Sequence, residues 1–266
     1  MSQIKNPTAS IIIVNYNNAK YLEKSLNSAT KQSFKNKEVI VVDDISEDNS
    51  LEILEKYKHK IKLFINKKKT NIGSYNQINS YYKGILKSKG KYLFFLDSDD
   101  YFKKKKVETI IKKFKESNSK KIIFDLPILK FKKKLIFKKF IQKSFILSSW
   151  PRFTPQSCIS IERNYAIKIF KILKIKKYPT IWLDFRIAII TYLYFKKIFI
   201  FYKYLTFYRQ LNNSASKKYK TMTKKWWIRR KEAHEFFSKI ATKLNIKTRV
   251  KADEIITKAI NIFINE

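Results

Sequence analysis

The sequence is poor in cysteine, glycine and proline, and it has no long uninterrupted apolar run. A single cysteine, Cys158, excludes a disulfide scaffold and fits a reducing compartment. With 3 glycines and 5 prolines, the 266 residues contain no Gly- or Ser-rich linker. The longest apolar stretch, residues 187–205, is interrupted by lysines, whereas a membrane-spanning helix needs about 20 apolar residues. We therefore expect neither a signal peptide nor a transmembrane helix.

Acidic residues are also scarce, with 21 Asp and Glu against 59 Lys and Arg, which gives a net charge of +38. The excess is uneven, because residues 1–100 hold 17 basic and 11 acidic residues and the rest of the chain holds 42 and 10. The abundance of Lys, Ile, Asn and Phe is what an AT-rich genome would encode. The alternative is a surface that meets phosphate on nucleic acid or an anionic membrane. A hydrophobic content of 44% nevertheless indicates a folded globular protein.

The first hundred residues alternate strand and helix patterns. Apolar, β-branched runs at Ala9–Val14 and Val39–Val42 are typical of buried parallel strands, and shorter runs follow at 63–65 and 92–96. Helical spacing of apolar residues predicts helices over 21–29, 50–58 and 75–87. This order predicts an α/β fold in which a mostly parallel sheet carries helices on both faces.

The second half of the chain is less regular. Apolar runs predict a strand at 122–126, a hairpin over 128–137, a strand at 156–161 leading into a helix, and one or two strands within 198–207. An apolar helix begins at Asp184. Two amphipathic helices follow Met222. The apolar face of the first carries Trp226, Ala233, Phe237, Ile240 and Leu244, and that of the second carries Ile255, Ile256, Ala259, Ile260 and Phe263.

Polar residues directly follow three of the predicted strands, at 15–17, 43–44 and 97–100. Ligands of open α/β sheets bind at the carboxyl ends of strands, so these clusters should converge on one crevice. Asp97 and Asp99, separated by one residue, suit Mg²⁺ or Mn²⁺, which takes one or two protein carboxylates together with substrate phosphates. The alternative is a turn with a helix cap before Val107; residues 43–50 could likewise only cap a helix.

Five segments, at 10–17, 32–34, 41–46, 71–73 and 90–100, closely resemble the family 2 glycosyltransferases of the GT-A fold in order and spacing. The resemblance implies an inverting transfer from a nucleotide-diphospho-sugar, with UDP-sugars favoured and Mg²⁺ or Mn²⁺ as cofactor. Residues 1–105 would be the Rossmann-like nucleotide-sugar-binding half and 106–216 the acceptor-binding, catalytic half. Residues 217–266 would be a C-terminal helical extension. The chain lacks the Gln-x-x-Arg-Trp motif of the processive members, which favours addition of a single sugar.

The same resemblance implies roles for individual residues. The donor site would consist of Val14, Tyr16, Asp43, Asp44, Asp97 and Ser98, with Tyr16 and the aspartates after the second strand contacting the nucleoside. Asp99 would be the main metal ligand and Asp97 would lie near both ribose and metal. An Arg-Asn pair usual in the family is missing after Gly73, and Asn76 or Asn79 could substitute for it.

Inversion needs a base that takes a proton from the acceptor hydroxyl as that oxygen attacks C1. Asp184 occupies the position of the family's catalytic carboxylate, although Leu183 stands where a Glu is usual. The alternative for Asp184 is a carboxylate favoured by the helix dipole. Residues 207–216 resemble the family's tyrosine–arginine segment followed by serines, which supports the assignment, but Leu211 replaces a frequent histidine.

The basic, aromatic cluster at 224–230 allows two interpretations. It belongs either to an ordinary amphipathic helix with one tryptophan in the core, or to a peripheral attachment to an anionic membrane. We expect a cytoplasmic enzyme, on this second interpretation attached to the cytoplasmic face of the inner membrane, acting on a glycan or lipid-linked acceptor. Competing hypotheses are a basic nucleic-acid-binding protein, although no known motif supports one, and a related nucleotidyltransferase, whose usual Gly-rich N-terminal loop is missing.

Overall fold

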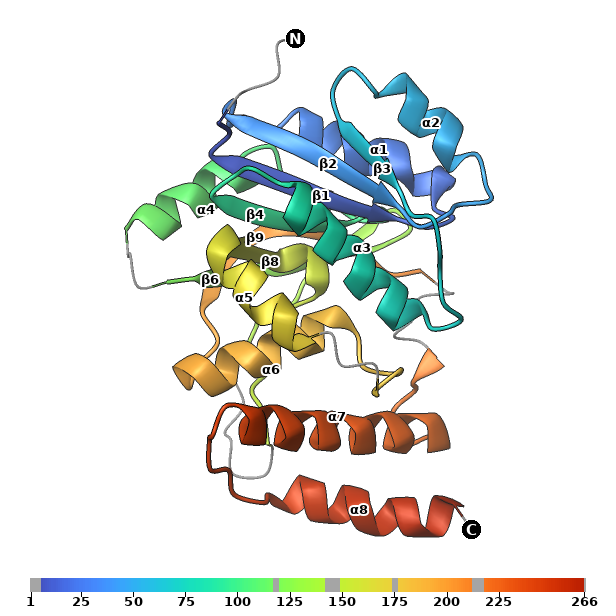
Figure 1. Ribbon diagram of the computed structural model, residues 1–266, viewed down its shortest axis with the longest axis vertical. Helices are drawn as coiled ribbons and strands as arrows, with labels where there is room; N and C mark the ends of the chain where they lie inside the picture. Colours follow the sequence, from blue (N-terminus) through green and yellow to red (C-terminus); the bar gives the residue numbers. More distant parts are fainter. Residues whose placement is uncertain (1–5, 117–119, 142–148, 174–176, 212–217, 266) are drawn as a thin grey trace.

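The computed structural model describes residues 6–116, 120–141, 149–173, 177–211 and 218–265 (Figure 1). Within these residues nine strands form one sheet in the order β3-β2-β1-β4-β8-β6-β9-β5, with β7 paired to β6. The strands are β1 (Ala9–Asn15), β2 (Lys37–Asp43), β3 (Lys62–Ile65), β4 (Tyr92–Asp97), β5 (Tyr101–Phe102), β6 (Ile122–Phe131), β7 (Lys134–Phe137), β8 (Ile159–Glu162) and β9 (Ile200–Arg209). The helices are α1 (Ala19–Thr30), α2 (Ser50–Lys56), α3 (Gly73–Lys87), α4 (Lys106–Lys115), α5 (Arg163–Leu173), α6 (Leu183–Phe195), α7 (Lys224–Lys243) and α8 (Ala252–Asn265), with a short 3₁₀ turn at Gln156–Cys158.

The first four strands are parallel, which confirms the arrangement predicted from the first hundred residues. Ile11 lies between Val39 of β2 and Phe94 of β4. Helices cover both faces of the sheet at β1, so the strand is buried on both sides. This explains its continuous run of β-branched residues. The carboxyl ends of β1, β2 and β4 therefore lie at the same edge of the sheet.

The second half continues this sheet through an antiparallel strand. β8 pairs antiparallel with β4 and with β6, and β9 then pairs parallel with β6. The strand and the hairpin predicted separately over 122–137 are one long strand, β6, and its partner β7. Residues 198–207 contribute a single strand, β9.

Helices cover both faces of the sheet. One core contains buried side chains of α3, α5, α6 and α7, and the other contains side chains of α1, α2 and α4. Gly84 allows α3 to lie close to β1, because a Cβ at that position would be 2.5 Å from Cγ2 of Ile12.

The two C-terminal helices stack at the end of the molecule away from β1–β3 (Figure 1). α7 packs on α6 through Phe236, Phe237 and Ile240, and α8 packs on α7. Trp227 is buried, so the 224–230 cluster is part of a packed helix with a tryptophan in the interior. Among the described residues no helix has the length and apolar character needed to cross a membrane.

Candidate active site

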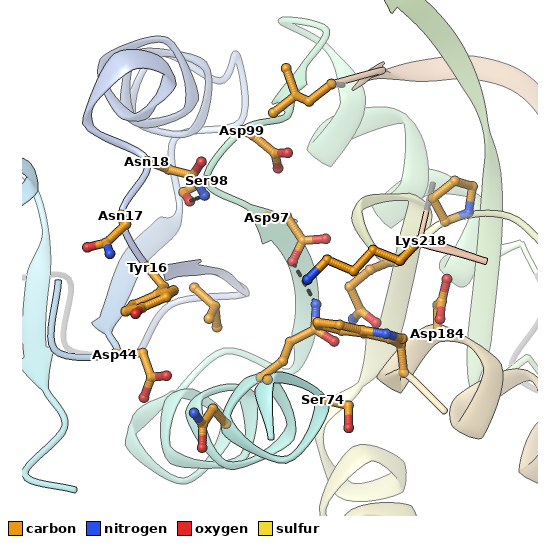
Figure 2. A pocket seen from close by; sticks show the side chains of 18 of the residues that line it. Tyr16, Asn17, Asn18, Asp44, Ser74, Asp97, Ser98, Asp99, Asp184 and Lys218 are labelled. Carbon is orange, nitrogen blue, oxygen red and sulfur yellow. Dashed lines mark hydrogen bonds between the residues drawn. The ribbon is translucent and has the colours of Figure 1, made fainter. Parts of the chain in front are cut away.

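A cleft of about 1540 Å³ opens at the carboxyl ends of β1 and β4 (Figure 2). It is lined from the first half by Val14, Tyr16, Asp44, Asp97, Ser98 and Asp99, and from the second half by Asp184 and other side chains. Seven of the eight residues predicted for the site therefore border one space. Their individual roles stay predictions.

Asp97 is the last residue of β4 and is held by two donors from α3. The Tyr81 hydroxyl donates to Oδ1 at 2.9 Å, and the Gln77 amide does so at 3.4 Å. Burial, together with the neighbouring charge of Asp99, raises the pKa of Asp97 to about 7. A carboxylate pair whose ionisation is disfavoured in this way is stabilised by a bound cation.

Asp99 and Ser98 lie in the turn that follows β4. Burial raises the pKa of Asp99, and its main-chain oxygen accepts a 2.6 Å hydrogen bond from Nε of Arg209. The Ser98 hydroxyl accepts from the Asn18 amide at 3.0 Å, and the Ser98 N–H donates to the Val14 carbonyl. The turn is thus fixed both to the end of β1 and to the end of β9.

Asp100 does not cap a helix, because α4 begins only at Lys106. It is fully buried, and its two oxygens accept from the Ser157 hydroxyl at 2.6 Å and from the Arg209 N–H at 2.7 Å. Burial and the charges of Asp99 and Asp97 raise its pKa well above the usual range. Asp100 therefore braces the turn that presents Asp99.

Asp43 faces away from the cleft, unlike its neighbour Asp44. Its carboxylate is fully buried and accepts from the Asn15 amide at 2.8 Å and from both the N–H and the hydroxyl of Ser46. The predicted nucleoside contact of Asp43 does not match this position, because these donors already surround its oxygens. Asp43 instead shapes the loop that follows β2.

Tyr16 and Asp44 form the far end of the cleft. The Tyr16 ring is 45% exposed, and Nζ of Lys69 lies 4.9 Å from its centroid while bonding to Glu47 at 2.6 Å. Asp44 is buried beside Asn66, whose amide donates to Oδ1 at 2.8 Å, and burial raises its pKa. An open aromatic face beside a carboxylate suits a nucleobase and its N–H or ribose hydroxyl donors.

Asp184 lies in the first turn of α6, on the side of the cleft opposite Tyr16 (Figure 2). Its Oδ1 accepts from the Phe185 N–H at 2.7 Å. Burial raises the pKa of Asp184, and the charge of Arg229 on α7 opposes that shift. The fully buried Arg186 fixes this end of α6, because its guanidinium donates to the carbonyls of Leu173, Tyr178 and Ile181.

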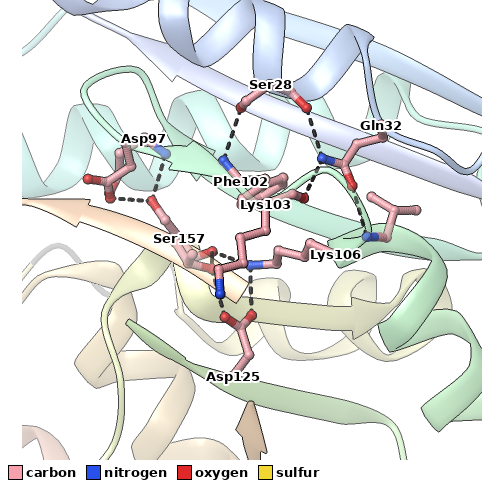
Figure 3. Close-up of polar contacts among 11 residues, drawn as sticks. Ser28, Gln32, Asp97, Phe102, Lys103, Lys106, Asp125 and Ser157 are labelled. Atoms are coloured by element: carbon pink, nitrogen blue, oxygen red, sulfur yellow. Dashed lines mark hydrogen bonds and ion pairs between the residues drawn. The ribbon is translucent and has the colours of Figure 1, made fainter. Parts of the chain in front are cut away.

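A buried ion pair lies beneath the turn after β4 (Figure 3). Nζ of Lys106 is 2.7 Å from Oδ2 of Asp125, and both side chains are fully buried. Lys106 also donates to the Ser157 carbonyl at 2.7 Å, and the Ser157 hydroxyl accepts from the Asp97 N–H at 3.0 Å. This network connects β6 and α4 to the main chain that carries Asp97.

The donor set at the end of β4 fits the cofactor that the sequence predicts. Among the described residues no three His, Cys, Asp or Glu side chains gather as a metal-binding group. Asp97 and Asp99 both line the cleft, however, and two carboxylates suffice for a Mg²⁺ or Mn²⁺ that takes its remaining ligands from phosphates and water.

Several cleft residues were not predicted from the sequence. Gln77 of α3 borders the cleft, and the buried Tyr81 lies one helical turn further along, a spacing that could have indicated their shared partner Asp97. Among the cleft cations, Arg209 and Arg229 lie in the 207–216 and 224–230 segments named above, without a predicted place in the cleft. The others come from separate elements and have no such pattern: Lys20, Lys69, Lys132 and Lys218.

The two asparagines that could replace the missing Arg-Asn pair differ in their position relative to the cleft. Asn76 lines the cleft, where its side chain holds Thr70 through bonds of 2.8 Å, whereas Asn79 is exposed and does not border the cleft. Leu211, which replaces the histidine noted in the sequence analysis, also borders the cleft.

A parallel-sheet half with acidic strand ends, extended by a mixed sheet that supplies a facing carboxylate, defines a nucleotide-sugar-binding fold of the GT-A type. The solved structures with this fold include Staphylococcus aureus TarS 1–349 in complex with UDP-GlcNAc (TM-score 0.62, 20% identity, 94% of this chain and 69% of that one). They also include the mannosyltransferase PcManGT of Pyrobaculum calidifontis in complex with GDP-Man and Mn²⁺ (TM-score 0.57, 11% identity, 96% and 69%).

Residues 10–171 match glycosyl transferase family 2, and the chain belongs to that family. It is 39% identical over 97 residues to the poly(ribitol-phosphate) β-N-acetylglucosaminyltransferase TarS of S. aureus, covering 36% of this chain and 17% of that protein. It is 30% identical over 190 residues to an uncharacterized glycosyltransferase of Nostoc, covering 66% and 56%. A cholesterol galactosyltransferase of Borreliella burgdorferi is 36% identical over 113 residues, covering 41% and 30%. The matches thus span at most about half the length of these relatives.

Proposed function

We propose that this chain is an inverting glycosyltransferase that moves one sugar from a nucleotide-diphospho-sugar to a hydroxyl group of a glycan or lipid-linked acceptor. The observation that carries the proposal is that one cleft holds Asp97 and Asp99 at the end of β4 and Asp184 at the start of α6. UDP-sugars are favoured as donors, since the TarS structures that share the fold hold UDP or UDP-GlcNAc.

In the proposed reaction the donor lies with its nucleoside at Tyr16 and Asp44 and its diphosphate near Asp99. The acceptor hydroxyl gives its proton to the Asp184 carboxylate while its oxygen forms the new bond to C1 of the sugar. The bond between C1 and the diphosphate oxygen breaks on the opposite face, and its electron pair leaves with the nucleotide. Asp184 must be ionised to act, and the positive charge of Arg229 favours that state.

Asp99 and Asp97 would hold Mg²⁺ or Mn²⁺, which when bound offsets the charge that develops on the departing diphosphate. Lys218 extends its amine toward the Asp97 side of the cleft (Figure 2) and can bind the same diphosphate.

The first test is protection from thermal unfolding by UDP, GDP, CDP and dTDP in the presence of Mn²⁺, with DNA, RNA and nucleoside triphosphates as comparison ligands. We expect the largest rise in melting temperature with UDP, because a ligand that binds only the folded state stabilises it. A rise with DNA or RNA and none with any nucleoside diphosphate would support the nucleic-acid-binding alternative. A response limited to nucleoside triphosphates would support the nucleotidyltransferase.

The second test is Asp99→Asn, which keeps the shape of the side chain and removes its charge. We expect turnover of the donor to fall by about 10²–10³-fold, as for loss of a transition-state electrostatic contact, and the Mn²⁺-dependent part of the UDP shift to disappear. Glu52→Gln, on the exposed side of α2, is the control and should change neither. Full activity of Asp99→Asn would place the metal elsewhere.

A further inference from the structure

α8 is oriented with its apolar side outward. Ile255, Ile256, Ile262 and Phe263 are exposed by 60%, 52%, 62% and 75%. Together with the exposed Ala259 they follow helical spacing and form one stripe along the helix, here named the α8 stripe. A 14-residue helix is about 21 Å long, so the stripe is a continuous apolar strip on the surface.

Polar side chains on the opposite side of α8 fix this orientation. Asn261 and Thr257 are buried, and the Asn261 amide donates to the Trp227 carbonyl of α7 at 3.1 Å. Asp253 pairs with Arg230 of α7 at 2.8 Å and accepts from the Ser149 hydroxyl at 3.1 Å. Turning the stripe inward would break these bonds and take the Asp253 carboxylate away from Arg230, whose side chain is only 24% exposed.

The segment that leads from α7 into α8 is strongly basic. Between Glu235 and Asp253 the sequence has five basic residues and no acidic one. Lys239, Lys243, Lys247 and Arg249 are exposed. The two acidic residues at the start of α8 are already neutralised, Asp253 by Arg230 and Glu254 by Lys258 at 2.8 Å. An apolar strip that directly follows a basic segment matches the surface of a bilayer that contains anionic lipids.

The same charge argues against a second copy of the chain as the occupant. Two molecules that each carry a net charge of +38 repel one another, whereas an anionic bilayer attracts them and receives the apolar side chains. The 224–230 cluster is less suited to this contact, since Trp227 is buried and Arg230 is engaged by Asp253.

We propose that α8 lies in the interface of an anionic bilayer, with the α8 stripe among the acyl chains and the basic residues of 239–251 at the headgroups. This binding needs neither donor nor acceptor. Its failure would therefore leave the proposed glycosyl transfer untouched, and the nucleotide shift described above tests that function separately.

The experiment is co-sedimentation of the full chain with vesicles of phosphatidylcholine alone or with equal parts of phosphatidylglycerol, at low and high salt. We expect binding to the anionic vesicles to exceed binding to neutral ones by at least about ten-fold and to weaken as salt screens the charges. Ile262→Ser/Phe263→Ser should lower binding to the anionic vesicles by at least about ten-fold, because the apolar area that enters the bilayer is lost.

The matched control is Ile65→Ser/Leu86→Ser, which changes two apolar side chains exposed by 46% and 50% on β3 and α3. It should bind as the unaltered chain does, and circular dichroism should show that both double variants are folded. Equal binding to both vesicle types, or undiminished binding of the α8 variant, would overturn the proposal. A dimer in light scattering that Ile262→Ser/Phe263→Ser disperses would overturn it as well, in favour of contact between copies.

Discussion

At the scale of single residues, the site depends on which of two adjacent aspartates faces the cleft. Asp43 is the last residue of β2, and its side chain points to a buried cluster with Asn15 and Ser46. Asp44 follows the strand and lines the cleft. Successive side chains of an extended chain point in opposite directions, so only one of the pair can face a ligand. The sequence predicts the pair, but the register of β2 decides which one.

Tyr81 positions Asp97, and its hydroxyl can be removed with little change in shape. Tyr81→Phe deletes the 2.9 Å hydrogen bond to Asp97 and leaves a carboxylate that is harder to ionise. We expect kcat/KM for donor turnover to fall about 10–100-fold, the value of one hydrogen bond to a charged group.

Tyr92→Phe is the control for this change, since Tyr92 is also buried but lies at the opposite end of β4, stacked on Phe114. It should retain activity. Equal effects of the two substitutions would mean that Tyr81 acts only through stability.

Arg229 brings a charge from α7 to the proposed base. Burial raises the pKa of Asp184 and Arg229 opposes the rise, so Arg229→Gln should raise that pKa further. A base works only above its pKa. The acid side of the pH profile of kcat/KM should therefore move to higher pH, and activity should be lost earlier as the pH falls.

The exposed Lys225→Gln, in the same helix, should leave the profile in place. A profile unmoved by Arg229→Gln, with activity lowered equally at every pH, would show that Arg229 serves binding rather than the ionisation of Asp184.

At the scale of elements, the buried pair of Lys106 and Asp125 joins α4 to β6 beneath the turn that carries the aspartates. Lys106→Met leaves Asp125 in the core without its cation, and we expect the free energy of unfolding in urea to fall by about 3–5 kcal/mol. The pKa of Asp125 is already raised by burial and would rise further, so protonation at low pH should recover part of the loss.

Lys113→Met, on the same helix but paired only at the surface, should cost less than about 1 kcal/mol. Lys106→Met/Asp125→Leu should be more stable than Lys106→Met alone. If it is not, the loss comes from packing of the lysine stem rather than from the unpaired charge.

Helices and strands with a clear local pattern were predictable from the sequence. The strands and surfaces that they pack against were less predictable. The β-branched run of β1 and the apolar runs of β2 and β4 predicted a parallel sheet. The insertion of β8 between β4 and β6 depends on contacts distant in sequence, which no local period reports. The last helix illustrates the same limit, because its apolar spacing predicts an amphipathic helix without predicting that this face points to solvent.

At the scale of the whole molecule, the two halves differ in net charge and in exposed apolar surface. The first half carries a small net charge and the acidic ends of the strands. The second half carries nearly all of the excess of cations and the α8 stripe. Electrostatic attraction would thus orient the molecule, with α8 toward an anionic surface and β1–β3 away from it (Figure 1).

The continuous sheet also limits how this molecule can respond to its substrates. β8 bonds to β4 along one edge and to β6 along the other, with Ile161 paired to both Leu93 and Ile122. A hinge rotation of the two halves would have to break this ladder, so domain closure is not available to adjust the cleft. We therefore expect the separation of Asp99 and Asp184 across the cleft to change little when a substrate binds. If the proposed function holds, the side chains at the rim of the cleft would then select the acceptor.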